Sequence, residues 1–485
     1  DVNFFKKKYN IDIYINCEVI DINPAKKTIT VRNNKTKIVT NDTYDKLVIA
    51  TGARARIPNI KGINQENVFC LRNIKDAQDI KQYVKVRKPK SAIVVGTGPI
   101  GFEVYENLIK LELDVTMLEQ SDKITSLDPD MAKFLRVILE SKGLKIRTSI
   151  HIIEILPNTI KLNTGEDIDF ELLIFATGVV PNVELAKAIG IKLGKSGAIK
   201  VDRYMKTNLE DIYACGDCIQ TFSITTRKPI YKSMGTVANK TGRIAGDVIT
   251  GGSLKYKGGL GTTIFKIFNY VIASTGMTEV EAIAEGIDVI CCHNIKPNKP
   301  FYMGGNELLI KAVADRRFGK LIGAQIIGKE GVDKRIDVFV ALITYGAKVE
   351  ELFDLDLAYA PPFSTTKDPV IYTGMILNNT ISENRYIITS DQIDQLGEDI
   401  QIIDIRSVKD FEIGHIKGAI NIPFETLRDN LNRLYKNMTT VVYSNKGMTG
   451  NVAQNLLINN GFKKVYNVSG GYKFYSTIRT PKSKI

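Results

Sequence analysis

Along the first 180 residues, the spacing of apolar positions predicts a series of short strands. Residues 11–15 and 28–31 alternate apolar and polar side chains, which predicts strands with one buried face. Residues 46–50 and 172–176 are apolar runs followed by a Thr-Gly pair, as expected for strands buried on both faces of a parallel sheet. Because this element occurs twice, about one domain apart, the pattern predicts two similar nucleotide-binding units.

The pattern changes after residue 256, where hairpin-like strands precede an amphipathic helix. From Ile336 onward, apolar residues recur at i, i+3, i+4 and i+7, which places them on one helical face. Residues 378–384 are polar and lack periodicity, so we expect a linker there. Residues 385–480 are then expected to form a last compact α/β unit.

Composition narrows the class of protein. A length of 485 residues predicts three or four domains. No apolar run reaches the ~18 residues that a membrane span needs, so no membrane association is expected. Six cysteines are too few for a disulfide framework, which favours reduced thiols and a cytoplasmic location. With only three histidines, no metal site is predicted.

The net charge of +13 leaves three interpretations. Nucleic-acid binding is not expected, because the basic residues are spread along the chain and mixed with acidic ones. The two remaining interpretations are a solvated basic surface and the binding of phosphate-rich small molecules.

A dinucleotide-binding motif lies between two predicted strands. Residues 91–95 form the first strand, residues 96–101 read G-T-G-P-I-G and open a helix, and residues 114–118 form the second strand, which ends at Glu119. A G-x-G-x-x-G sequence alone is weak evidence, but the strand, helix and following acid make it specific. The alternative is a glycine turn in an unrelated α/β unit.

Each residue of this motif has a physical role in binding NADH. Gly96 permits the tight turn, Gly98 lets the backbone approach a pyrophosphate, and Gly101 allows close packing of helix and strand. The helix N-terminus attracts the phosphates. Glu119 would accept from the ribose hydroxyls and repel a 2′-phosphate, which favours NADH, with NADPH as the alternative cofactor.

Three further segments carry a resemblance to a known family. Residues 44–54 and 175–182 look like its two ATG crossovers, and residues 207–217 look like its flavin-binding strand. On these motifs, the chain resembles the FAD-dependent pyridine nucleotide–disulfide oxidoreductases. The residues agree with this, since the third segment ends at Gly216-Asp217 and places a carboxylate at the C-terminal edge of a strand, within reach of a ribitol hydroxyl.

The resemblance implies the cofactor contacts. A helix beginning near Ala238 would direct its positive N-terminus at the electron-rich end of reduced flavin. The backbone at Val19 would contact the adenine, and Glu103 would lie where nicotinamide meets flavin. Besides the motif glycines and Glu119, the cofactor-binding residues expected on this basis are Val19, Ala50, Thr51, Gly52, Ile100, Glu103, Gly178, Gly216, Asp217 and Ala238.

The C-terminal half of the chain resembles one particular group within this family. Residues 261–276 resemble the start of the family's dimerisation domain, and residues 358–369 look like coenzyme A-disulfide reductases and their persulfide-reducing relatives. This implies a homodimer in which Tyr359 is catalytic and reaches the partner's active site. It also implies a CoA-linked disulfide substrate whose phosphates Lys367 helps to hold. For Tyr359, a turn residue packed before two prolines remains the alternative reading.

The same resemblance gives two more substrate positions, but it identifies no redox cysteine in this chain. Asn239 and Tyr302 fall near substrate positions. In these enzymes NADH reduces FAD, which reduces a mixed disulfide between CoA and a cysteine following the first FAD-binding βαβ unit. The chain opens in a segment that resembles the one after that cysteine. We therefore expect a fragment of a reductase that binds FAD poorly and turns over no disulfide.

The cysteines offer two alternatives to that interpretation. Cys215 and Cys218 form a C-x-x-C sequence, but they flank Asp217 of the flavin motif, so a redox disulfide is not expected. Cys291 and Cys292 are expected to be strand residues on opposite faces. None of the six cysteines matches the redox position.

Residues 404–423 resemble the rhodanese domain. Its catalytic loop would be residues 444–450, where Ser444 replaces the cysteine and Thr449 replaces a usual arginine. A serine cannot form a persulfide, so no sulfane sulfur transfer is expected. The loop around Gly447 could still cradle an anion. A binding or regulatory module and a vestigial domain retained for stability both remain open.

Together these motifs imply an α/β protein. It has two nucleotide-binding three-layer domains, the FAD part truncated, an α+β dimerisation domain and a C-terminal rhodanese-like α/β domain. The expected domains are 1–84 with 204–255 for FAD, 85–203 for NAD, 256–377 for dimerisation and 385–480 for the rhodanese-like part.

Three functions compete. The first is a FAD- and NADH-dependent disulfide reductase for CoA-disulfide or CoA-persulfide substrates. The second is an NADH oxidase or peroxidase of the same fold. The third is a non-catalytic binding protein derived from a decayed reductase.

Overall fold

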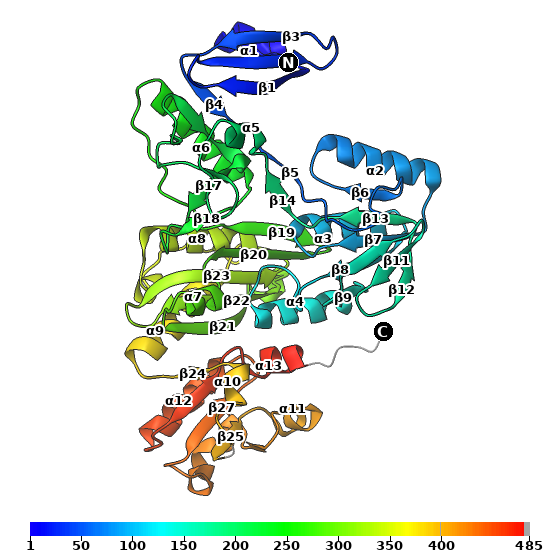
Figure 1. The fold of residues 1–485 in the computed structure, drawn as a ribbon. Coiled ribbons are helices and arrows are strands. Elements are labelled where there is room, and N and C mark those ends of the chain that lie inside the picture. Colours follow the sequence, from blue (N-terminus) through cyan, green and yellow to red (C-terminus); the bar gives the residue numbers. More distant parts are fainter. Residues whose placement is uncertain (398, 480–485) are drawn as a thin grey trace. The chain divides into compact units, whose positions relative to one another are not determined.

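The computed structural model describes residues 1–397 and 399–479, and the chain divides into two compact units (Figure 1). Each unit is built from two separate stretches of chain. The first unit combines residues 1–56 with 179–259, and the second combines residues 57–178 with those from 260 onward. No helix among the described residues is long and apolar enough to cross a membrane.

The first unit opens with a short helix and an antiparallel three-stranded sheet in the order β1-β2-β3. Their bounds are α1 (Val2–Tyr9), β1 (Cys17–Asn23), β2 (Thr28–Asn33) and β3 (Val39–Thr43). The strand predicted at residues 28–31 is confirmed. The strand predicted at residues 11–15 is wrong, because this exposed segment has no neighbouring strand and pairing begins only where Cys17 meets Asn33.

The rest of the first unit surrounds a parallel pair, β4 (Leu47–Ile49) and β16 (Ile212–Ala214). Ile49 and Ile212 are buried there beneath α6 (Gly235–Ile249), whose Ile244 and Ala245 join the same core. The apolar run at residues 46–50 therefore forms a strand as predicted. The remaining elements are β5 (Ala53–Ala55), β14 (Val179–Pro181), α5 (Glu184–Ala188), β15 (Ile199–Lys200), η1 (Gly216–Cys218), β17 (Ile219–Phe222) and β18 (Pro229–Ile230).

The second unit contains a five-stranded parallel sheet in the order β6-β13-β7-β8-β9. Val94 faces a core shared with helices α3 and α4, whereas its neighbour Ile93 faces a core shared with a small antiparallel sheet, β10-β11-β12. This alternation gives three layers and explains why the strand is apolar throughout. The bounds are β6 (Val68–Cys70), α2 (Ile74–Arg87), β7 (Ser91–Val95), α3 (Pro99–Lys110), β8 (Asp114–Glu119), α4 (Pro129–Glu140), β9 (Ile146–Thr148), β10 (Ile152–Ile155), β11 (Thr159–Leu162), β12 (Asp167–Asp169) and β13 (Leu172–Phe175).

A five-stranded antiparallel sheet follows, in the order β19-β20-β23-β22-β21. The predicted amphipathic helix is confirmed as α8, which buries Ile336, Phe339 and Ile343. The bounds are β19 (Thr263–Ile267), β20 (Tyr270–Gly276), α7 (Glu279–Ala284), β21 (Val289–Pro297), η2 (Phe301–Met303), β22 (Glu307–Asp315), β23 (Lys320–Gly328), α8 (Val332–Tyr345), η3 (Val349–Leu352) and α9 (Pro369–Ser382).

The linker predicted at residues 378–384 is largely wrong, because α9 continues to Ser382. Leu377 and Thr380 are buried on the inner face of this helix. The Thr380 hydroxyl donates to the Ile376 carbonyl at 3.0 Å and lies 3.0 Å from the Arg385 carbonyl oxygen. The polar side chains that suggested a linker belong to the last turn of a buried helix.

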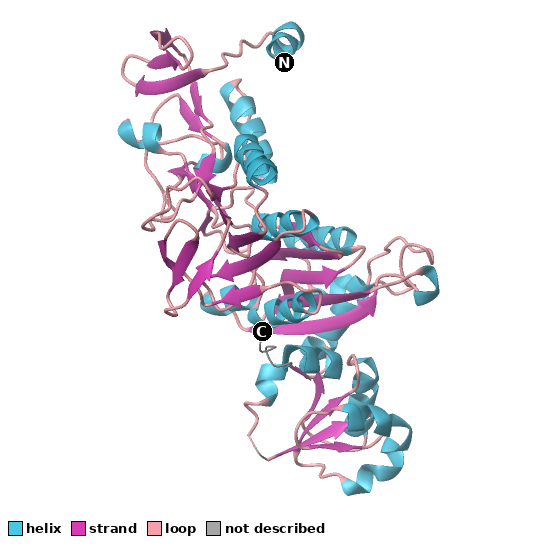
Figure 2. Ribbon diagram, turned by 90° about the vertical axis from the view of Figure 1, so that its right-hand side faces the viewer, coloured by secondary structure: helices cyan, strands magenta, loops and turns pink. Residues whose placement is uncertain are grey.

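The C-terminal domain is a parallel sheet in the order β24-β28-β27-β25-β26, with helices beside it (Figure 2). The predicted catalytic loop follows β27, and α12 begins within it at Met448. The bounds are β24 (Ile387–Ile388), α10 (Ser390–Ile393), β25 (Ile400–Asp404), α11 (Val408–Ile413), β26 (Ala419–Asn421), η4 (Phe424–Arg433), β27 (Thr439–Tyr443), α12 (Met448–Asn459), β28 (Val465–Val468) and α13 (Gly471–Arg479).

Three parts of the second unit meet at a buried charged cluster around Lys311. The Lys311 ammonium on β22 lies 2.9 Å from Asp130 at the start of α4, 3.3 Å from Asp128 and 2.6 Å from Glu279. Burial alone would lower the pKa of Lys311, but these carboxylates outweigh it and raise that pKa above its ordinary value. Lys311 is therefore a charged lysine with a fully buried side chain.

The same cluster reaches the C-terminal domain through His293 on β21. His293 Nε2 lies 2.7 Å from Asp130 Oδ2, and its backbone N–H donates to the Ser469 hydroxyl at 2.7 Å. The imidazole stacks on Phe474 of α13 with ring centroids 4.1 Å apart, and Phe474 also stacks on Phe134 of α4. These contacts join the parallel sheet, the antiparallel sheet and the C-terminal domain.

Replacing Lys311 should destabilise the second unit and weaken its response to acid. Lys311→Met leaves three buried or half-buried carboxylates without their cation, which should cost about 3–5 kcal/mol of unfolding free energy. In the native chain, burial raises the pKa of Asp130, but His293 and Lys311 hold it well below the ordinary value of about 3.9. That contribution to stability is present above pH 4 and is lost as pH falls.

In the variant, Asp130 keeps His293 but loses Lys311, one of the two cations that lower its pKa, so stability should fall less steeply with acid below pH 4 than in the native chain. Urea unfolding at several pH values measures both effects. Lys348→Met, at an exposed lysine of the same unit, is the control and should change the midpoint little. A loss of less than 1 kcal/mol in Lys311→Met would contradict the role given to this cluster.

Candidate cofactor and substrate sites

The glycine turn after β7 has the geometry that a dinucleotide needs. Gly96 has φ +107°, and a Cβ there would lie 2.6 Å from the Ala176 carbonyl oxygen. A Cβ on Gly101 would lie 2.1 Å from the Gly96 carbonyl oxygen. Gly98, in contrast, faces open space and begins α3 without a side-chain cap. The N-terminal N–H groups of α3 are thus accessible to a pyrophosphate, and the residues fit this group.

Glu119 ends β8 beside this turn with its carboxylate already oriented. Its Oε2 accepts from the backbone N–H and the hydroxyl of Thr97, at 3.0 and 2.7 Å. Its Oε1 accepts from the N–H and hydroxyl of Ser121, at 2.9 and 3.0 Å. Burial would raise the pKa of Glu119, but these hydrogen bonds outweigh burial and lower it. The group is therefore an anion at neutral pH, as a ribose acceptor must be.

Thr97 is a residue that the sequence did not single out. It occupies a variable position of the G-x-G-x-x-G motif, and only the structure shows that it fixes Glu119. A hydroxyl-bearing residue between the first two glycines, with an acid at the end of the next strand, is the signal that could have found it.

The role of Glu119 predicts a preference between the two nicotinamide cofactors. Glu119→Gln should weaken NADH binding about tenfold, because a charge-assisted hydrogen bond is lost. NADPH binding should not weaken, since the repulsion of its 2′-phosphate is removed. Fluorescence titration of the purified chain measures both affinities. Asp122→Asn, at an exposed acid three residues away, is the control, and equal affinities for NADH and NADPH in the native chain would refute the assignment.

The first ATG-like crossover is held by Asn182. The Thr51 hydroxyl donates to the Asn182 carbonyl at 2.6 Å, and the Asn182 side-chain amide donates to the Thr51 carbonyl at 2.8 Å. The Asn182 N–H donates to the Gly52 carbonyl at 3.0 Å. Gly52 has φ +68° and nothing within 4 Å of a Cβ position. The expected residues Ala50, Thr51 and Gly52 thus form a turn with open backbone, fixed by a residue to which the sequence assigned no role.

The Gly216-Asp217 turn lies against the first turns of α6. Gly216 has φ +79°, and its N–H donates to the Thr241 hydroxyl at 3.0 Å. A Cβ on Gly216 would lie 3.9 Å from Ala238 Cβ. The predicted residues Gly216, Asp217 and Ala238 are therefore brought together, next to a helix N-terminus with no side-chain cap. A turn that carries an aspartate and packs against an uncapped helix start fits a flavin ribitol and ring edge.

The other predicted flavin contacts are more dispersed. Val19 lies at the register irregularity of β1, where the ladder with β2 skips a residue. Gly178 has φ +92° with open space around it, and it is the last residue of the first stretch of chain in the second unit. The open space around Gly178 leaves its backbone accessible.

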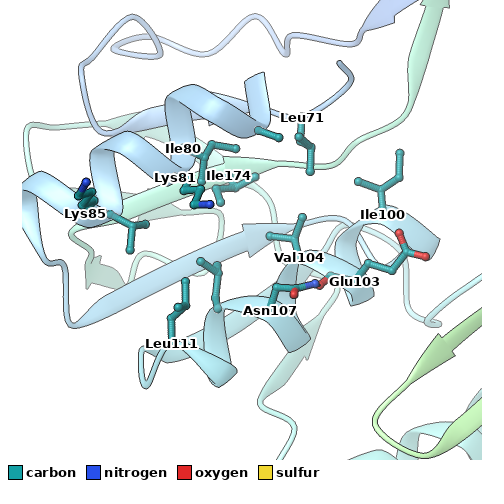
Figure 3. A pocket seen from close by; sticks show the side chains of 13 residues that line it. Leu71, Ile80, Lys81, Lys85, Ile100, Glu103, Val104, Asn107, Leu111 and Ile174 are labelled. Carbon is teal, nitrogen blue, oxygen red and sulfur yellow. The ribbon is translucent and has the colours of Figure 1, made fainter. Parts of the chain in front are cut away.

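Ile100 and Glu103 line a different feature, an apolar cavity of about 530 Å³ between α2 and α3. Figure 3 shows both residues, with the Glu103 carboxylate near Ile100 and with Leu71, Ile80 and Val104 as neighbouring walls. Glu103 is exposed at the start of α3. The wall of the cavity is mostly apolar, although Lys81, Lys85, Glu103 and Asn107 also line it.

All six cysteines are free thiols in the structure. Cys215 and Cys218 are buried, and burial raises the pKa of both, that of Cys215 to about 11. Cys291 and Cys292 are also buried in β21, where burial raises the pKa of Cys292 to about 12. These four thiols are protonated at neutral pH and are poor nucleophiles. That the redox thiol lies outside this chain stays a prediction.

The four predicted substrate residues lie on separate segments. Tyr302 lies in η2 and Tyr359 lies between η3 and α9, and both rings are exposed. Lys367 is partly buried just before α9, with its ammonium 5.1 Å from the Tyr372 ring centroid. Among the described residues, no hydrogen bond or ring contact joins Tyr302, Tyr359 and Lys367. Asn239 is exposed on α6 in the first unit.

The loop before α12 is organised around the Ser444 hydroxyl. Ser444 Oγ accepts from the N–H groups of Gly447 and Gly450, both at 3.1 Å, and the residue is buried. Gly447 has φ +90° and caps α12. Two of the donors that a catalytic loop of this kind would turn towards an anion are thus satisfied by the loop's own side chain.

Comparison with known proteins agrees with this architecture. Residues 3–239 match the pyridine nucleotide-disulphide oxidoreductase family, residues 262–369 match its dimerisation domain, and residues 389–477 match the rhodanese-like domain. The chain belongs to the pyridine nucleotide-disulfide oxidoreductases, which are FAD- and NAD(P)H-dependent enzymes. The predicted fold class, cofactors and C-terminal domain are confirmed.

Individual relatives are similar over most of their length. The NAD(P)H sulfur oxidoreductase (CoA-dependent) of Pyrococcus furiosus is 35% identical over 77% of this chain and 84% of its own. An NADH oxidase of Methanocaldococcus jannaschii is 35% identical over 76% of this chain and 82% of its own. The crystal structure of reduced Bacillus anthracis CoADR-RHD matches with a TM-score of 0.95 and 34% identity, over 98% of this chain and 87% of that one.

Proposed function

We propose that this protein is an NAD(P)H-dependent flavoprotein reductase of CoA-disulfide or CoA-persulfide substrates. The observation that carries the proposal is the similarity of almost the whole chain, C-terminal domain included, to CoADR-RHD, at a TM-score of 0.95 and 34% identity. The CoA-dependent sulfur oxidoreductase from Pyrococcus furiosus supports the same substrate class.

Within this proposal, the chain's own residues bind and orient two cofactors. The turn at Gly96, Gly98 and Gly101 presents the N–H groups of α3 to the NADH pyrophosphate, and Glu119 accepts from its ribose. Asp217 and the start of α6 at Ala238 hold the flavin's ribitol and its electron-rich edge. Bound FAD supplies the route by which hydride electrons from the nicotinamide reach a disulfide.

The remaining predicted cofactor contacts are proposed in supporting positions. The backbone at Val19 contacts the adenine, and the two crossovers line the flavin. Glu103 and Ile100 lie at the nicotinamide side. The full set of proposed supporting residues is Val19, Ala50, Thr51, Gly52, Ile100, Glu103 and Gly178.

Substrate binding is assigned to the dimerisation domain and α6. We propose that Lys367 binds the CoA phosphates, with Asn239 and Tyr302 as further contacts. The exposed Tyr359 is proposed to act in the partner subunit's active site, so the enzyme is a homodimer. The match to the family's dimerisation domain supports this state. The six free thiols support a cytoplasmic location.

A second candidate, NADH oxidase, is favoured by the oxidase relative from Methanocaldococcus jannaschii. Full-length, flavin-loaded enzyme that includes the redox cysteine should oxidise NADH faster with CoA-disulfide than with oxygen. Lys367→Ala should reduce kcat/KM for CoA-disulfide about tenfold, because one charge-assisted phosphate contact is lost, and should leave the oxygen rate unchanged.

Lys320→Ala, at an exposed lysine of the same domain, is the control for Lys367→Ala. NADH consumption and thiol release are followed separately. A reaction with oxygen that exceeds the reaction with CoA-disulfide would replace the proposal by the oxidase. Full-length protein that purifies without flavin absorbance would favour a non-catalytic binding protein.

The C-terminal domain should not transfer sulfur. Ser444 cannot form a persulfide, and its hydroxyl is engaged by Gly447 and Gly450. With thiosulfate and cyanide, thiocyanate formation should stay at the background rate. Ser444→Ala should leave NADH-dependent turnover unchanged while lowering stability by about 1–2 kcal/mol, because two buried N–H groups lose their acceptor. Thiocyanate formation that disappears in Ser444→Ala would contradict this assignment.

A further inference from the structure

Four lysines and one glutamate gather where the C-terminal domain meets the antiparallel sheet. Lys296 lies on β21 and Lys367 lies before α9, both in the dimerisation region. Lys446 lies in the loop that begins at Ser444, and Lys473 lies on α13. Glu307, at the start of β22, binds Lys446 through Oε1 and Lys473 through Oε2. All five residues are partly buried.

Two of these lysines share one aromatic ring. The Lys296 ammonium lies 4.0 Å from the Tyr372 ring centroid, and the Lys367 ammonium lies 5.1 Å from it. Lys296 Nζ also lies 3.1 Å from Met448 Sδ, at the first residue of α12. Lys296 therefore extends from the antiparallel sheet to the loop of the C-terminal domain. Tyr372 attracts both cations through its ring face, which holds them close together.

The cluster has an excess of positive charge. Both oxygens of Glu307 are engaged by Lys446 and Lys473, and no carboxylate in the described ranges forms an ion pair with Lys296 or Lys367. Asp368, next in sequence to Lys367, is fully engaged by Arg335 and the Ser364 hydroxyl. Four ammonium groups thus face one carboxylate.

Burial and repulsion act on Lys296 in the same direction. Burial first, and then the charges of Lys446 and Lys367, lower the pKa of Lys296 below its ordinary value. A half-buried group of like charges raises the free energy of the unliganded protein, and an anion placed among them would remove that cost. The arrangement therefore favours a ligand with several negative charges over a single carboxylate.

We infer that Lys296, Lys367 and Lys446 form one binding site for the phosphate groups of the substrate, to which the cysteine-free C-terminal domain contributes Lys446. The inference rests on the proposed function for the identity of the substrate, and it extends the substrate site from the dimerisation domain to the C-terminal domain. Lysine ammonium groups suit phosphates as point charges, and three from separate segments can contact phosphates some distance apart. The rhodanese-like domain then acts as one wall of the substrate site.

Phosphates at this site could come from CoA or from a dinucleotide, and two probes separate these sources. Adenosine 3′,5′-bisphosphate carries the phosphate pattern of the CoA nucleotide, and ADP carries a pyrophosphate like that of NADH. Calorimetric titration of the whole chain with each probe needs no turnover. We expect the bisphosphate to bind more tightly than ADP at this site, and its binding to weaken with added salt.

Lys446→Gln should weaken binding of the bisphosphate about tenfold, since it removes one charge-assisted contact. Lys296→Gln should weaken it by a similar factor and gives a second variant on a different element. Lys464→Gln, at an exposed lysine of the same C-terminal domain, is the matched control and should bind as the native chain does. Circular dichroism of each variant verifies the fold.

In full-length, flavin-loaded enzyme that includes the redox cysteine, Lys446→Gln should raise KM for CoA-disulfide about tenfold with kcat unchanged. It should not affect reduction of pantethine, a disulfide without these phosphates. Unchanged bisphosphate affinity in both Lys446→Gln and Lys296→Gln would overturn the inference, even if CoA-disulfide is turned over. ADP binding as tightly as the bisphosphate, with equal sensitivity to Lys446, would overturn the assignment to CoA.

The proposed reductase function and the proposed phosphate site can fail independently of each other. Lys446-dependent bisphosphate binding by an enzyme that does not reduce CoA-disulfide would uphold this site and refute the reductase.

Discussion

A single buried ammonium group, that of Lys311, holds the second unit together. Its three carboxylate partners lie on α4, on the segment before it and on α7, so the parallel sheet and the antiparallel sheet are joined by charge. Such a charge is tolerated in the interior only when its partners are fixed, because an unpaired buried ion costs several kcal/mol. His293 extends the same cluster to Phe474 and Ser469, and this fixes where the C-terminal domain packs.

The position of that domain decides which of its residues reach the rest of the chain. With α13 packed against α4 and β21, the loop after β27 lies beside the start of β22 and places Lys446 at Glu307. A loop that in active relatives would present a cysteine here presents a cation to the dimerisation region. The proposed substrate contact of Lys446 would account for retention of the domain without sulfur chemistry.

The sequence alone was sufficient to predict the parts of the structure whose geometry follows from a local rule. The glycine turn was predictable because a close backbone approach requires glycine at fixed positions, and Gly96 and Gly101 indeed leave no room for a Cβ. Glu119 was predictable because an acid is expected at the end of the next strand. The apolar face of α8 follows from periodicity. Residues 11–15 also alternate, yet they form no strand, since a strand depends on a neighbour that alternation does not supply. The last turn of α9 was missed because Thr380 is polar, although its hydroxyl bonds to carbonyl groups in the buried helix end.

Contacts between distant segments could not be predicted from one sequence. Thr97 and Asn182 fix functional turns through hydrogen bonds to residues 22 and 131 positions away. The pairing of Lys296 and Lys367 on one tyrosine ring depends on how β21 and α9 pack. Such contacts arise only from tertiary structure, and no local pattern of charge or periodicity distinguishes those lysines from others on the surface.

The hydroxyl at the centre of the Ser444 loop has one more consequence. A thiolate at this position would be a target for peroxide and heavy metals, and each oxidation step would change its charge and size. An alcohol that accepts two backbone hydrogen bonds is inert to both. The loop therefore keeps one shape whether the surroundings are oxidising or reducing. The C-terminal rhodanese-like domain is thus unaffected by the redox chemistry of the cofactor-binding domains.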